Sequence, residues 1–175
     1  MNYLYHWVPE NMEGEVLYPL NILKEINLNL FNSQVSKYKG REKVMNQFIP
    51  TLECLWNDVL HLSAIHPKDV KNALIEAGSE KNIKMKCYQV DSNLLEIEKT
   101  TIYFSGDIPS ERMKMKNFTN YNPLELNNHS RVPQETKDYY KKMIKLGKSP
   151  LIFHKAPHIL YKGTINIKNC DVIEV

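Results

Sequence analysis

Apolar positions along the chain fall into short strand-like runs and a few helix-like periods. Runs rich in aromatic and β-branched residues predict strands at residues 3–8, 59–62, 84–90, 100–105, 149–153, 158–161 and 171–175. Apolar residues at helical spacing predict helices that begin at Pro19, Pro67 and Pro133. Gly78 and Gly147 follow the last two periods and are typical of helix C-terminal ends.

The order of these elements indicates the fold class. Strands and helices are interspersed without regular βαβ alternation, which favours an α+β fold. A length of 175 residues suits one domain, so we expect a single domain over residues 1–175. Residues 106–130 are rich in Asn, Lys, Pro and Met, and they predict a long loop excursion within this domain.

Composition excludes several classes of protein. The chain is 42% hydrophobic, with nine Pro and six Gly, which excludes collagen, a coiled-coil rod and a fully disordered chain. No apolar run approaches the ~20 residues that span a bilayer. The first residues lack the charged and apolar regions of a signal peptide. We therefore expect a cytoplasmic globular protein without a membrane partner.

The charge pattern gives one candidate surface for a partner. The chain has 23 Lys and Arg against 20 Asp and Glu, and only three of the basic residues are arginines. Arginine is the usual residue for bidentate phosphate or guanine contacts, so a dedicated sequence reader is not favoured. Lysines cluster from Lys114 to Lys155. This stretch is either a solvated helix face or an electrostatic landing site for a nucleic-acid or protein acceptor.

Cysteine and histidine spacings give no metal signature. Cys54, Cys87 and Cys170 are odd in number, far apart and without a CxxC pair, so free thiols are expected. His61 and His66 lie five residues apart across a predicted strand-to-helix turn. They could converge on a metal, but no nearby carboxylate pair supports this, and hydrogen-bonded structural histidines are favoured. A Cys-His nucleophilic pair remains an alternative that no local signature supports.

Four segments carry the more specific signal. The common Rossmann, P-loop, zincin and serine-hydrolase motifs are absent. The four segments are YHWVPENM at 5–12, LHLSAIHP at 60–67, TTIYFSGD at 100–107, and a closing segment at 157–175 that begins with PHILY (157–161) and ends with DVIEV (171–175). In this order they resemble the ADP-ribosyltransferase superfamily, and most closely its DarT-type branch of toxins that modify DNA bases with NAD.

The resemblance implies a fold and an activity. It implies split antiparallel sheets with flanking helices, NAD as cofactor, and transfer of ADP-ribose to a nucleic-acid or protein acceptor. His6 would hold the nicotinamide-side ribose by hydrogen bonds, and Tyr5 or Trp7 would border the pocket. The alternative is structural: His6 satisfies backbone groups near its strand, and Trp7 is a core anchor.

Two positions depart from the family pattern. His158 stands where the family has its catalytic glutamate, and Ile65 or His66 stands where it has an arginine. A neutral imidazole accepts a proton but supplies no negative charge to a developing cation. Four alternatives therefore stay open: a non-classical transferase, a transferase in which another carboxylate swings into the site, a nucleotide-binding module without turnover, and an interaction protein. The implied catalytic residues are His158 and His6, and the implied cofactor-binding residues are His6, Tyr5, Trp7, Asn11, Ser63, His66 and Tyr161.

Overall fold

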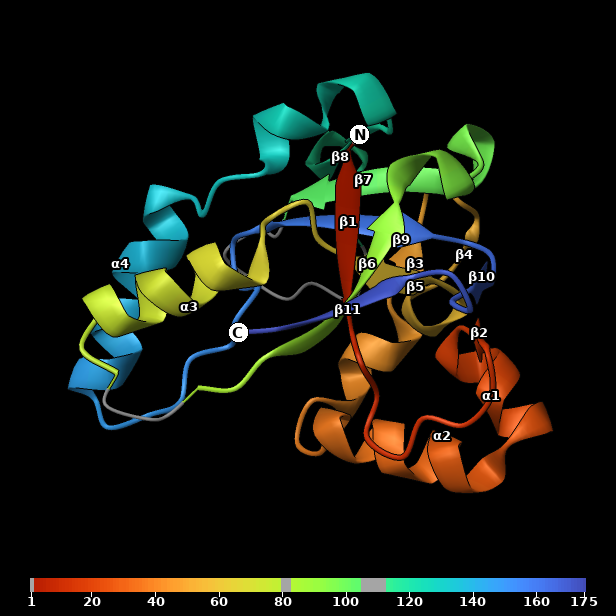
Figure 1. Ribbon diagram of the computed structural model, residues 1–175, viewed down its shortest axis with the longest axis horizontal. Helices are drawn as coiled ribbons and strands as arrows, with labels where there is room; N and C mark the ends of the chain where they lie inside the picture. The colour runs from red at the N-terminus through yellow and green to blue at the C-terminus, as the bar shows by residue number, and fades with distance from the viewer. Residues whose placement is uncertain (1, 80–82, 105–112) are drawn as a thin grey trace.

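The computed structural model describes residues 2–79, 83–104 and 113–175 (Figure 1). Its α-helices are α1 (Leu20–Ile26), α2 (Leu28–Val35), α3 (Pro67–Glu76) and α4 (Gln134–Lys145). Its strands are β1 (Tyr3–Trp7), β2 (Val16–Leu17), β3 (Phe48–Ile49), β4 (Cys54–Leu55), β5 (Leu60–Leu62), β6 (Lys86–Asp91), β7 (Thr100–Phe104), β8 (Phe118–Asn120), β9 (Pro157–Tyr161), β10 (Ile165–Asn166) and β11 (Asp171–Glu174). None of the helices in these ranges is long and apolar enough to cross a membrane.

The strands pair into two main antiparallel sheets. One sheet has the order β1-β6-β11, and the other has the order β5-β9-β7-β8. Two short pairs, β2 with β10 and β3 with β4, complete the pairing within the described residues. Backbone hydrogen bonds between Tyr5 and Ser63, at 2.8 and 3.0 Å, join β1 to the end of β5. Mixed helices and antiparallel sheets agree with the expected α+β class.

Strand β9 lies at the centre of the core. Successive side chains of a strand point to opposite faces of its sheet, so β9 serves two apolar layers. Ile159 packs with Leu4 and Val90 on one face, and Leu160 packs with Trp56 on the other; Ile159 and Leu160 are both fully buried. Strand β9 therefore contributes side chains to the apolar clusters on both faces of its sheet.

Helices cover opposite ends of the sheets. Figure 1 shows α3 and α4 side by side at one end of the molecule and α1 and α2 at the other. Helix α3 begins at Pro67, and the side chain of His66 accepts a hydrogen bond from the Lys68 backbone N–H. Gly78 follows the helix with φ +93°, a backbone conformation that favours glycine.

The segment 149–153 forms no strand, contrary to the prediction. Its backbone groups pair with side chains of α4 instead of with a neighbouring strand. The Tyr140 hydroxyl donates to the Ile152 carbonyl oxygen, and the Leu151 N–H donates to the Tyr139 hydroxyl at 3.2 Å. Since α4 already satisfies these groups, the apolar run packs as turns against the helix.

The predicted excursion at 106–130 is also partly wrong. Residues 106–112 lie outside the described residues, but the rest of the segment belongs to the fold. Phe118–Asn120 pairs with β7 as the edge strand β8, and Tyr121 and Leu126 are buried. The Tyr121 hydroxyl donates to the Ser92 carbonyl oxygen at 2.9 Å, which ties the segment to the turn after β6.

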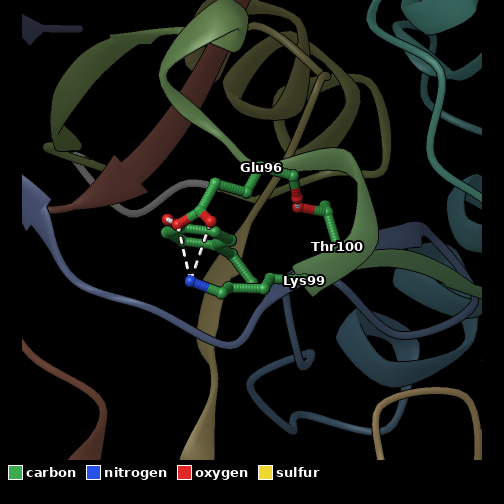
Figure 2. A network of polar contacts seen from close by, with 4 residues as sticks. Glu96, Lys99 and Thr100 are labelled. Atoms are coloured by element: carbon green, nitrogen blue, oxygen red, sulfur yellow. Dashed lines mark hydrogen bonds and ion pairs between the residues drawn. The ribbon is translucent and has the colours of Figure 1, made fainter.

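A polar network marks the beginning of β7 (Figure 2). The Lys99 ammonium lies 2.8 and 2.9 Å from the two carboxylate oxygens of Glu96, and the Thr100 hydroxyl donates to the Glu96 carbonyl oxygen at 2.7 Å. The Tyr161 hydroxyl donates to the same carboxylate at 3.3 Å. Tyr161 therefore uses its hydroxyl within the fold, on the face of β9 opposite to His158.

Candidate functional site

A hollow of about 560 Å³, part of which is open solvent, lies between helix α2 and strands β1 and β5. We call it the α2 pocket. Its walls are mostly aliphatic, with contributions from Met12, Val16, Leu17, Leu20, Leu23, Leu30, Val59 and Leu60. The polar side chains that line it are His6, Tyr18, Gln34, Lys37, Tyr38, Asn57 and His61. Such a combination of apolar walls and few polar groups is typical of small-molecule sites.

His6 is a neutral hydrogen-bonding group at this pocket. Its Nδ1 lies 2.8 Å from the His61 carbonyl oxygen, and a carbonyl only accepts, so Nδ1 carries the proton. Burial, with a smaller contribution from the positive charge of Lys37, lowers the pKa of His6 to about 4. At neutral pH the ring is therefore uncharged, and Nε2 is a hydrogen-bond acceptor.

His61 and His158 follow the same pattern. The Nε2 of His61 donates to the Trp56 carbonyl oxygen and the Nε2 of His158 donates to the Phe153 carbonyl oxygen, both at 3.0 Å. Burial lowers the pKa of His61 to about 3, with a further contribution from His158, and burial lowers the pKa of His158 to about 4. Each ring therefore keeps Nδ1 as an acceptor.

Trp56 contacts two members of the three-histidine cluster, which we define as His6, His61 and His158. Its ring centroid lies 4.4 Å from that of His61 and 5.9 Å from that of His158. Tyr103 lies 6.0 Å from His158 on the other side. These aromatic neighbours exclude water from the imidazoles, which explains why burial dominates their pKa values.

Asn57 is a buried polar residue whose position is fixed by the turn Trp56–Asp58. Asp58 holds this turn, because one carboxylate oxygen accepts from the Leu55 N–H at 2.7 Å and the other accepts from the Asn21 side chain at 2.6 Å. Asn57 is one of the residues that line the α2 pocket, and it is only 5% exposed. Its Oδ1 is buried without a hydrogen-bond partner.

Lys37 supplies the positive charge of the pocket. Its ammonium donates to the Gln34 side-chain oxygen at 2.6 Å, one turn earlier in the helix. Desolvation lowers the pKa of Lys37, and its charge in turn lowers the pKa of both His6 and His61. The ammonium therefore acts electrostatically on the interior of the pocket.

The residues implied by the family resemblance do not all meet. His6 lines the α2 pocket, and His158 lies beside His61 without lining that pocket. Tyr5 and Trp7 point to the opposite side of β1, where they line a second apolar hollow of about 230 Å³ that includes solvent.

The other implied cofactor-binding positions are also spread over the fold. The ring of His66 lies 5.0 Å from that of Tyr5, and Ser63 uses its hydroxyl to accept from the Ile65 N–H at 3.0 Å. Asn11 is exposed, in a turn after β1, with φ +58°. The structure thus gathers only His6 of this set at the α2 pocket.

The pocket residues Lys37, Asn57 and His61 were not predicted as binding residues from the sequence. Asp58 caps the turn by accepting from the Leu55 N–H. No sequence pattern predicts that Asn57 Oδ1 lacks a hydrogen-bond partner, since its pairing depends on residues from distant segments of the chain. Within residues 2–79, 83–104 and 113–175, no group of three or more His, Cys, Asp or Glu side chains could hold a metal ion.

Comparison with known proteins assigns no family. A scan against protein-family models and searches of curated proteins and of solved structures found no match. The resemblance to ADP-ribosyltransferases therefore rests on the four sequence segments, and the function of the α2 pocket must be argued from its own residues.

Proposed function

We propose that this protein binds NAD in the α2 pocket as an ADP-ribosyltransferase-like domain, with the nicotinamide ribose beside His6. The observation that carries the proposal is the pocket itself: aliphatic walls, a neutral histidine from the first strand and one lysine. The first of the four family-like segments contributes this histidine. Nitrogen Nε2 of His6 would accept a hydrogen bond from a ribose hydroxyl.

The chemistry of the pocket fits part of a dinucleotide. Aliphatic side chains suit a flat heteroaromatic ring, and the Lys37 ammonium suits a phosphate group. One nucleoside half would occupy the interior, and the phosphates would lie toward Lys37.

Binding without turnover is the favoured form of this function. Among the described residues, no carboxylate lines the α2 pocket. Neutral imidazoles hold hydroxyls, but they do not supply the negative charge that stabilises an oxocarbenium-like transition state. A nucleotide-binding module therefore agrees best with these residues.

ADP-ribosyl transfer is the second candidate, and His158 is the observation that favours it. NAD, when bound, supplies an ADP-ribosyl group with nicotinamide as the leaving group. His158 is neutral at pH 7 and donates through Nε2 to Phe153, so its Nδ1 is a proton acceptor; because His158 does not line the α2 pocket, transfer would require the acceptor hydroxyl or amine to approach it beside His61. His6 would orient the ribose through Nε2, and Trp56 would exclude water.

An acceptor would use the lysines of α4 in this second candidate. Two of the clustered lysines are already paired: Lys137 lies 3.4 Å from Glu76, and Lys155 lies 3.6 Å from Glu135. Helix α4 and helix α2 lie at opposite ends of the molecule (Figure 1). A nucleic acid bound to α4 would therefore have to extend along the sheets to approach the pocket, which also favours the module without turnover.

The test is NAD binding followed by nicotinamide release. We expect NAD to raise the melting temperature and to give a saturable binding isotherm, because a ligand that binds only the folded state stabilises it. The variant His6→Ala should weaken binding at least tenfold, and His129→Gln, outside the pocket, should bind as wild type. No thermal shift at millimolar NAD, or unchanged binding by His6→Ala, would refute the proposal. Release of nicotinamide together with ADP-ribose attached to the added DNA, RNA or protein, both reduced in His158→Gln, would establish transfer, whereas free ADP-ribose alone would indicate NAD hydrolysis.

A further inference from the structure

The unpaired oxygen of Asn57 is the polar feature of the α2 pocket that the fold itself does not explain. A buried acceptor without a partner destabilises the folded state, and most buried polar atoms in proteins are paired. The residue is 95% buried and its Oδ1 has no partner, whereas the neighbouring Asp58 uses both carboxylate oxygens. An apolar side chain of similar size would fill the same position without this penalty.

The surroundings of Asn57 limit what can pair with it. Two lining atoms are acceptors, Oδ1 of Asn57 and Nε2 of His6, while the His6 and His61 N–H groups are already bonded to backbone carbonyls. A partner for these acceptors must bring O–H or N–H groups. Aliphatic walls next to Asn57 strengthen such a bond, because few competing polar groups are near.

Lys37 limits the charge of the partner. Its ammonium is the only formal charge among the side chains that line the α2 pocket in the described part of the chain. It is held by Gln34, and it lies close enough to His6 and His61 to disfavour their protonation. A cation in the pocket would be repelled by this lysine, and an anion would be attracted.

We propose that Asn57 is a ligand-recognition residue, and that the α2 pocket takes an anionic polyol of the sugar-phosphate class. A hydroxyl of the ligand donates to Asn57 Oδ1 in the apolar interior, and its phosphate lies beside the Lys37 ammonium. This inference rests on the proposed use of the α2 pocket as the ligand site, but not on NAD as the ligand. It assigns the discrimination between ligands to Asn57 and Lys37, residues outside the four family-like segments.

The experiment measures binding of three probes by calorimetry or by NMR titration: NAD, ribose 5-phosphate and methyl phosphate. Methyl phosphate keeps the anion and lacks the sugar hydroxyls. We expect ribose 5-phosphate to bind at least tenfold more tightly than methyl phosphate. Asn57→Leu and Lys37→Ala should each weaken ribose 5-phosphate about tenfold or more, which corresponds to the loss of one buried or charge-assisted hydrogen bond. Lys68→Ala, an exposed lysine on α3, is the matched control and should bind as wild type.

Stability separates a recognition role from a structural one. Since Oδ1 has no partner in the fold, Asn57→Leu should be at least as stable as wild type in urea unfolding. Should the leucine variant fail to fold, the side-chain amide resonance of Asn57, assigned with Asn57→Asp, provides the second measurement. This resonance should shift when ribose 5-phosphate is added to wild-type protein.

The outcomes distinguish this inference from the proposed function. The inference would be overturned if Asn57→Leu bound ribose 5-phosphate as tightly as wild type, or if the Asn57 resonance did not move. In that case, NAD binding that depends on His6 would still support the proposed function. Asn57-dependent binding of ribose 5-phosphate without NAD binding would support the inference and refute NAD as the ligand. Absence of binding by both would overturn both.

Discussion

Acidification should destabilise this protein through the three-histidine cluster. Burial holds the pKa values of His6, His61 and His158 at about 4, 3 and 4 in the folded state. Unfolded histidine has a pKa of about 6.5, so below this pH the unfolded chain binds more protons than the folded one. The stability contributed by neutral, buried rings is therefore present above about pH 6.5 and is lost as the pH falls toward 4.

The magnitude follows from the difference between pH and the unfolded pKa. At pH 5 the unfolded rings are protonated and the folded rings are not, so each histidine removes about 2 kcal/mol from the free energy of unfolding relative to pH 7. The three together remove about 6 kcal/mol, which is comparable with the whole stability of about 5–15 kcal/mol of a typical domain. Protonation of one ring also repels the next, because His158 and His6 both act on His61.

Urea unfolding at pH 7, 6 and 5, followed by circular dichroism, measures this effect. The variant His158→Gln keeps an N–H donor for the Phe153 carbonyl and removes one titrating ring, so its dependence of stability on pH should be about one third smaller. A fall of less than about 1 kcal/mol between pH 7 and pH 5 would refute the assignment of neutral buried imidazoles. An equal pH dependence in wild type and His158→Gln would exclude His158 as a contributor.

Two further predictions concern packing and hydrogen bonding in the core. Gly163→Ala should lower the free energy of unfolding by about 1–3 kcal/mol, because the alanine Cβ would lie 2.5 Å from the ring of Tyr161, which is buried and bonded to Glu96. In urea unfolding, the same substitution should cost less in a Tyr161→Leu background, where the ring is absent. Equal losses of stability in both backgrounds would contradict the clash. Tyr121→Phe should lower the free energy of unfolding by about 1 kcal/mol, since the Ser92 carbonyl loses the hydroxyl donor at 2.9 Å and keeps only the longer bond from the Leu95 N–H at 3.4 Å. Unchanged stability in the same assay would contradict that role.

Local patterns predicted helices α1, α3 and α4 and strands β1, β5, β6, β7, β9 and β11. They did not predict the break at Asn27 that makes α2 a separate helix, nor the short strands β2, β3, β4, β8 and β10. Helix α3 shows why local prediction can succeed: Pro67 at its beginning, apolar residues on one face and Gly78 after its end all act within a few residues. The segment 149–153 shows the limit. Its composition favours a strand, but hydroxyls of Tyr139 and Tyr140 on α4 satisfy its backbone, and no local pattern records the approach of that helix.

The same limit applies to strand partners. The predicted strands β6 and β7 are neighbours in the sequence, but they belong to different sheets. Strand β8 was missed because Phe118–Asn120 is short and mostly polar, and its pairing with β7 forms at a sheet edge. Sheet membership depends on which edges meet, so strand runs alone cannot assign it.

By itself the sequence determined the α+β class, the free cysteines and the presence of a histidine in the first strand, because alternation, helical spacing and residue chemistry are local properties of the chain. Only the tertiary structure decided that His6 meets His61 and Lys37 at one pocket, that Tyr5 and Trp7 point away from it, and that Asn57 has no partner there. Burial and hydrogen-bond pairing are set by atoms from segments far apart in the sequence. The properties that define the candidate site therefore appear only when those segments are packed together.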